Sequence, residues 1–130
     1  MAARFTVSPR RDTIETTTLE LFAGISVRDR AVSMPWYERF LGGEPAFFPN
    51  DVEAVWELAE HRYLYIEERA EHAGHSHQTL FLEDFEERID AIAERGIEPD
   101  ERETYGNGVR HVTYRDPDGN EISFGGAPLE

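Results

Sequence analysis

The sequence predicts an α+β fold in which two βαβββ modules form curved mixed sheets around a cleft. Two observations support it. One plan, an alternating segment followed by an acidic residue, an amphipathic segment and a glycine, occurs at residues 21–42 and again at residues 76–96. Further alternating segments, typical of strands, follow each copy. A duplicated unit indicates two similar modules, and a concave surface between paired modules is the default place for a ligand.

The first copy predicts a strand and a helix. Residues 19–27 alternate between apolar and small or polar side chains, which indicates a strand with two distinct faces. Asp29 is a suitable helix cap. Because proline is best tolerated in the first turn, we expect the regular helix to begin near Pro35 and to end at Gly42. The apolar strand face should pack on this helix, which leaves the other face for the cleft.

The rest of the first half predicts two more strands. Residues 44–50 contain two prolines and indicate turns. Residues 52–58 alternate, and residues 62–67 are aromatic and β-branched, so both segments favour strands. The βαβββ order requires three strands after the helix, so at least one strand in each half is placed only weakly.

The second copy begins with a strand at residues 77–82. Asp84 and Glu87 resemble a capping box with aspartate in the serine place, and Gly96 should end the helix. A helical stripe of apolar residues lies between them: Phe85, Ile89, Ile92 and Ala93.

The remaining segments complete the second half. Residues 103–108 indicate a strand end and a turn, and residues 109–115 alternate. Residues 116–120 form a strong turn signal before a closing strand at residues 121–124.

This pattern predicts the domain organisation. We expect residues 1–18 to be an N-terminal tail and residues 19–130 to be a single domain. Within that domain, the first module should span about 19–68, a linker 69–76, and the second module about 77–126.

Composition restricts the partners. The 130 residues include 13 basic and 27 acidic side chains, for a formal net charge of -14. Such a chain repels phosphate groups, so we expect neither nucleic acid nor a membrane as partner. Cysteine is absent, which excludes disulfides and thiolate ligands. No apolar run reaches the roughly 20 residues of a membrane span, and residues 1–18 lack the apolar core of a signal peptide, so we expect a cytoplasmic protein.

Two motifs resemble a known family. Val27-Arg28-Asp29, followed by Trp36-Tyr37-Glu38-Arg39-Phe40-Leu41-Gly42, resembles the first-module signature of the vicinal oxygen chelate superfamily. Asp116-Pro117-Asp118-Gly119-Asn120-Glu121-Ile122 resembles its closing turn and strand. This superfamily includes glyoxalase I, extradiol dioxygenases and bleomycin-resistance proteins. The resemblance covers roughly residues 19–126 and implies the glyoxalase/bleomycin-resistance-like fold, a small-molecule ligand and a homodimer.

The resemblance also implies where relatives hold a divalent metal ion. The first-strand positions correspond to Phe22 and His77, and the last-strand positions to Tyr65 and Ser123. Phenylalanine cannot ligate a metal, serine and neutral tyrosine are poor ligands, and one imidazole is too few. We therefore expect no metal and no other cofactor, and a small organic molecule in the cleft between the modules.

The same faces supply the candidate ligand-binding residues. We expect six side chains to line the cleft: Phe22, Tyr65, His77, Phe81, His111 and Ser123. His77 is also the candidate general base, since its ordinary pKa suits proton transfer. The alternative is a hydrogen-bonded histidine at a strand edge. Trp56 alternates with apolar neighbours, which indicates core.

Two other functions stay open. His72, His75 and His77 form the densest histidine cluster, and the alternative to a polar linker is a metal site that uses His75, His77 and a glutamate. That site would suit a metal-dependent lyase, isomerase or dioxygenase. A non-catalytic dimeric binding or regulatory module is the third hypothesis.

Overall fold

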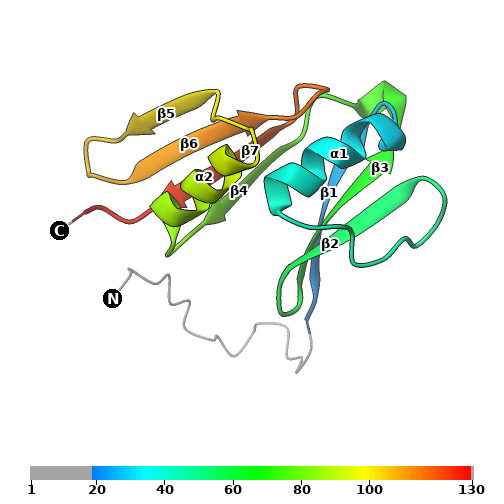
Figure 1. The fold of residues 1–130 in the computed structure, drawn as a ribbon, viewed down its shortest axis with the longest axis horizontal. Helices are drawn as coiled ribbons and strands as arrows, with labels where there is room; N and C mark the ends of the chain where they lie inside the picture. Colours follow the sequence, from blue (N-terminus) through cyan, green and yellow to red (C-terminus); the bar gives the residue numbers. More distant parts are fainter. Residues whose placement is uncertain (1–18, 130) are drawn as a thin grey trace, which may run out of the picture.

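The computed structural model describes residues 19–129, and Figure 1 shows the arrangement of the elements. The predicted tail at 1–18 lies outside the described residues. The elements follow in the order β1 (Leu21–Val27), α1 (Arg30–Leu41), β2 (Glu53–Ala59), β3 (Arg62–Glu68), η1 (Ala70–His72), β4 (His77–Phe81), α2 (Phe85–Glu94), β5 (Glu101–Thr104), β6 (Arg110–Arg115) and β7 (Glu121–Gly126). Within 19–129, no helix is both long enough and apolar enough to cross a membrane.

The strands form two mixed sheets. The first module, β1 to β3, contains a three-stranded sheet in the order β1-β3-β2, and the second, β4 to β7, a four-stranded sheet in the order β4-β7-β6-β5. In both modules the first strand runs parallel to the last, and the other neighbours are antiparallel. This duplicated topology confirms the predicted α+β class.

The predicted βαβββ order requires a third strand after the first helix, and the structure has one isolated bridge in place of it. Phe47 pairs with Val55 outside the regular strands. Pro45 and Pro49 flank Phe47, and neither can donate a backbone hydrogen bond, so a longer ladder cannot form here.

Both modules share one core. The ring of Phe40, on α1, lies with its centroid 5.0 Å from that of Tyr114 and 5.6 Å from that of Phe124, both on strands of the second module. Trp56 is buried in the same cluster, as its pattern predicted. We call the helix-packed face of each sheet its inner face and the opposite face its outer face. A helix from the first module therefore helps to bury the inner face of the second sheet.

The first helix begins earlier than predicted. It starts at Arg30, because Asp29 accepts hydrogen bonds from the backbone of Ala31 (2.9 Å) and Val32 (3.4 Å). Pro35 lies inside the helix rather than at its start, so that expectation was wrong. Ala31 and Pro35 are both exposed, which lets water satisfy the carbonyl that proline leaves without a donor. Gly42 ends the helix with φ 85°, as predicted.

The start of α2 also differs from prediction. Asp84 makes no side-chain capping bond, so the expected capping box is absent. Its carboxylate instead pairs with Arg88 one turn along the helix, at 3.2 Å. An ion pair at this spacing competes for the oxygens that a cap would use.

The turn before β7 joins the two modules. Asn120 is fully buried, and its Oδ1 accepts hydrogen bonds from the backbone of Gly74 (3.1 Å) and Ser76 (2.9 Å). Its Nδ2 donates to the carbonyl of Ser26 on β1 and to Asp116, both at 2.9 Å. One amide therefore fixes β1, the inter-module connection and the turn, which sets the position of β4 relative to β1.

Candidate functional site

The outer face of the first sheet is aromatic. Phe22 stacks on Tyr63 with ring centroids 4.4 Å apart, and Tyr65 meets Phe22 edge-on at 6.5 Å. The Tyr65 ring lies over Gly24, where an added Cβ would come within 2.6 Å of it. Phe22 and Tyr65 therefore belong to one surface, and their role in binding stays a prediction.

The outer face of the second sheet carries a hydrogen-bonded polar row. The Ser123 hydroxyl lies 3.2 Å from the Thr113 hydroxyl and 3.4 Å from Nε2 of His77. Ser123 is buried, whereas His77 is exposed. The imidazole therefore contacts one hydroxyl, that of Ser123, which in turn contacts that of Thr113. The arrangement brings together two predicted residues, and Thr113 is a third that sequence reasoning missed.

His111 lies farther along the same face. Its ring stacks on Tyr105 with centroids 5.4 Å apart, and its Nδ1 is 3.9 Å from Oε2 of Glu103. That nitrogen is buried and has no hydrogen-bond partner among the described residues. His111 is thus packed beside an aromatic ring and a carboxylate.

At the four positions where relatives hold a metal ion, the side chains of this chain are poor ligands for a divalent ion. The strand register pairs Thr79 with Ser123 and His77 with Glu121. The Glu121 carboxylate is held by Arg115 at 3.2 Å, and His75 is exposed ahead of β4. Residues 19–129 contain no group of three or more histidine, aspartate or glutamate side chains placed to hold a metal ion. The donor set at these positions is one imidazole, one phenol and one hydroxyl, which is unsuitable for a tight site.

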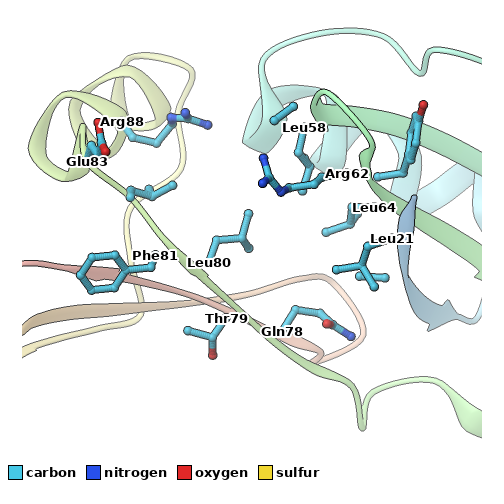
Figure 2. Close-up of a pocket in the computed structure, with 14 residues that line it drawn as sticks. Leu21, Leu58, Arg62, Leu64, Gln78, Thr79, Leu80, Phe81, Glu83 and Arg88 are labelled. Carbon is cyan, nitrogen blue, oxygen red and sulfur yellow. The ribbon is translucent and has the colours of Figure 1, made fainter. Parts of the chain in front are cut away.

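A cavity of about 580 Å³ lies between the two modules (Figure 2). Its lining is mainly apolar and comes from both modules: Leu21, Ala23, Leu58, Ala59, Arg62, Tyr63, Leu64, Gln78, Thr79, Leu80, Phe81, Leu82, Glu83 and Arg88. Of the six residues predicted to line a cleft, Phe81 lies here, and the other five lie on the outer faces instead.

The strand edges explain where this cavity forms. Gln78 on β4 donates a hydrogen bond of 3.4 Å to the carbonyl of Gly24 on β1, so the two edge strands meet there. Figure 1 shows β1 and β4 diverging toward the start of β1 and the end of β4. Residues at these two ends, among them Leu21 and Phe81, line the cavity. The helices do not cover this end, since Leu21 stays 60% exposed.

The sequence predicted a cleft between the modules but not this lining, because alternation assigned the apolar face of the first strand to the core. Leu21 and Leu64 share the inner face with Ile25, which is buried as expected. The signal available in the sequence was the length of the first strand. Its apolar face extends past the part that the 12-residue helix α1 covers.

A smaller cavity of about 270 Å³ adjoins the first. Leu58 and Arg88 line both, so this arginine lies between the two spaces. Glu44 and Glu57 line the smaller cavity, which makes it the more acidic of the two.

Comparisons with known proteins identify the family. The sequence model of the Glyoxalase/Bleomycin resistance protein/Dioxygenase superfamily matches residues 17–124. A glyoxalase/bleomycin resistance protein from Catenulispora acidiphila is 54% identical, with a TM-score of 0.82 over 85% of this chain and 100% of its own. No curated protein matches significantly.

More distant structures share the fold. A bleomycin-binding protein in complex with bleomycin is 18% identical, with a TM-score of 0.70 over 85% of this chain and 99% of its own. A lactoylglutathione lyase from Agrobacterium tumefaciens is also 18% identical, with a TM-score of 0.65 over 85% and 94%. The family match covers most of the sequence and agrees with the duplicated topology, so this chain belongs to the Glyoxalase/Bleomycin resistance protein/Dioxygenase superfamily.

Proposed function

We propose that this protein binds a small organic molecule in the cavity between its two modules, and that it does so without a metal ion. The observation that carries this proposal is the cavity itself. Its volume of about 580 Å³ lies within the range of roughly 300–1,000 Å³ typical of ligand pockets. Five leucines provide an apolar lining, while Gln78 and Thr79 offer hydrogen bonds that would orient a ligand.

Two further observations support it. The neighbour with bleomycin bound shows that this fold accommodates an organic ligand. The donor set at Phe22, Tyr65, His77 and Ser123 lacks the three good ligands that a catalytic metal generally requires.

We further propose a cytoplasmic homodimer. The first sheet exposes an aromatic outer face, and Phe22 is 45% exposed. A second copy that covered this face would remove apolar surface from water. Such a partner would bring the predicted residues on the outer face of the first sheet, Phe22 and Tyr65, close to additional side chains.

A neutral fluorescent probe, N-phenyl-1-naphthylamine, tests cavity binding with untagged protein. Ala23 lines the cavity, so Ala23→Trp should fill part of it and weaken probe binding about tenfold, the equivalent of roughly 1.4 kcal/mol. Ala31→Trp is the matched control, because Ala31 is exposed on α1 and does not line the cavity.

Dialysis against a chelator tests the absence of a metal role. Probe affinity should be equal before and after this treatment, and elemental analysis should find no stoichiometric metal. A loss of affinity that zinc or nickel restores would instead favour the metal-dependent alternative around His75 and His77. Equal affinity of the two tryptophan variants would contradict the location of the site.

A further inference from the structure

We propose that the ligand of the inter-module cavity is an organic monoanion: an apolar body that carries one carboxylate or comparable acidic group, bound by Arg62 and Arg88. This inference rests on the proposed function, since it names the class of molecule that the same cavity would take. It concerns two residues that come from different modules and that no sequence motif connects.

The two arginines converge on the cavity. Arg62 begins β3 in the first module, and Arg88 lies on α2 in the second. Figure 2 shows their guanidinium groups pointing toward one another from opposite sides of the cavity. Two like charges that face each other across an apolar space repel. An anion bound between them would attract both guanidinium groups and offset their repulsion.

Arg62 has no carboxylate partner among the described residues. No ion pair joins it to another residue within 19–129, and Arg88 has one partner, Asp84, on its own helix. Both members of that pair are well exposed, so the pair contributes little and leaves donors of Arg88 available.

Most other arginines in the described part of the chain are already engaged. Arg28, Arg102, Arg110 and Arg115 pair with carboxylates, while Arg30 and Arg95 donate to backbone carbonyls. In a chain with 27 acidic residues, an arginine that faces a cavity without an acidic partner is therefore informative. Arg39 and Arg69 also lack an ion pair in residues 19–129, but neither lines the cavity.

The remaining lining defines the rest of the ligand. Leu21, Leu64 and Leu80 provide apolar surface that would bind a hydrocarbon or aromatic body. Glu83 adds one carboxylate to the rim, against two guanidinium groups. Two guanidinium groups and one carboxylate give this rim a net formal charge of +1, which one negative charge on the ligand balances and two exceed.

A matched pair of probes tests this. 1-Anilinonaphthalene-8-sulfonate has the apolar body of N-phenyl-1-naphthylamine plus one sulfonate, so the pair isolates the contribution of the anionic group. We expect Arg62→Gln and Arg88→Gln each to weaken binding of the sulfonate about tenfold and to leave the neutral probe unchanged. Arg62→Lys, which keeps the charge but loses the planar fork, should fall between Gln and the native residue.

Arg69→Gln is the charge-matched control, since Arg69 is exposed, lies outside the cavity and uses its backbone amide rather than its side chain in the fold. It should bind both probes as the native protein does. Urea denaturation of every variant checks that folding is retained.

The outcomes separate the inference from the proposed function. If the neutral probe binds and responds to Ala23→Trp, but the sulfonate shows no dependence on either arginine, the anion assignment is wrong and the cavity site stands. If neither probe responds to Ala23→Trp, the proposed function fails and this inference fails with it. If Arg69→Gln weakens sulfonate binding as much as Arg62→Gln, the effect is general charge rather than a site, which also overturns the inference.

Discussion

The hydroxyl of Tyr37 donates a hydrogen bond of 2.7 Å to Oδ2 of Asp116, and both side chains are buried. Tyr37 lies on α1 in the first module, and Asp116 begins the turn between β6 and β7 in the second. Burial, and then the charge of Asp116, raises the pKa of Tyr37 well above its ordinary value. Together with Asn120, this pair fixes the angle between the modules and therefore the shape of the cavity.

Removal of this hydroxyl should destabilise the protein. Tyr37→Phe leaves a buried carboxylate oxygen with one donor fewer, so we expect the free energy of unfolding to fall by about 1–3 kcal/mol. Urea denaturation followed by circular dichroism measures this change. Tyr114→Phe is the control, because the Tyr114 hydroxyl is buried without a hydrogen-bond partner in the described residues. That substitution should be neutral or stabilising, and an equal loss in both variants would contradict the role of the bond.

Stability should fall in alkaline solution. The ordinary pKa of tyrosine is 10.0. In the fold, burial raises the pKa of Tyr37 far above this value and the pKa of Tyr114 to about 12. Above pH 10 the unfolded chain loses these protons while the folded chain keeps them, so each group lowers the unfolding free energy by roughly 1.4 kcal/mol per pH unit. For Tyr114 this loss should end near pH 12.

Below pH 10, neither Tyr37 nor Tyr114 should contribute to the pH dependence of the unfolding free energy. Urea midpoints at several pH values between about 9 and 11 give the slope, and Tyr37→Phe should reduce it. A slope that is the same in native protein and Tyr37→Phe would show that the pKa of Tyr37 does not determine alkaline stability.

Asn120 should be the polar residue whose loss is most damaging among those at the module junction. Its side chain makes four hydrogen bonds, to Gly74, Ser76, Ser26 and Asp116. Asn120→Ala should lower the unfolding free energy by about 3 kcal/mol, since buried partners lose their bonds together. Asn107→Ala is the matched control: Asn107 is exposed and makes one bond of 3.1 Å, to the backbone of Val109. If the two variants unfold at similar urea concentrations, Asn120 does not join the modules.

Gly126 should resist a methyl group. An added Cβ there would come within 2.7 Å of the ring of Phe85, the buried first residue of α2. Gly126→Ala should therefore cost about 1–3 kcal/mol through overpacking. At Gly106 nothing lies within 4 Å of the added atom, so Gly106→Ala should change stability little. Thermal denaturation of both variants checks the difference, and a tolerated Gly126→Ala would mean that Phe85 can shift.

Local chemistry made much of the fold predictable. Asp29, Gly42 and the turn at 116–120 act through their own backbone neighbours, and the structure places all three as expected. The predicted helix start at Pro35 and the predicted cap at Asp84 were wrong, because both depend on the surroundings of the residue in the fold. Solvent on one side of α1 tolerates the proline, and Arg88 takes the carboxylate that would have capped α2.

The candidate site was predictable only in part. The family resemblance assigned Phe22, Tyr65, His77 and Ser123 to one set of positions. In the structure Phe22 lies beside Tyr65 on one sheet face, and His77 lies beside Ser123 on another. Alternation did not indicate which residues line the inter-module cavity, because the position of that space depends on the angle between two sheets, and no period in the sequence encodes an angle. The placement of Arg62 and Arg88 on the same cavity also depends on the angle between the two sheets.

The strand order has a consequence for synthesis on the ribosome. β1 pairs with β3 alone, starting with Leu21 beside Arg62, and β4 pairs with β7 alone, starting with His77 beside Glu121. As the chain emerges, each module's opening strand has no sheet neighbour until its closing strand has been made. The antiparallel pairs β2–β3 and β6–β7 can form early because their strands are adjacent in sequence. The parallel pairs β1–β3 and β4–β7 form later, because a long segment of chain separates their two strands. Nascent chains that stall before β7 would expose β4 as an unpaired edge, open to association with other chains.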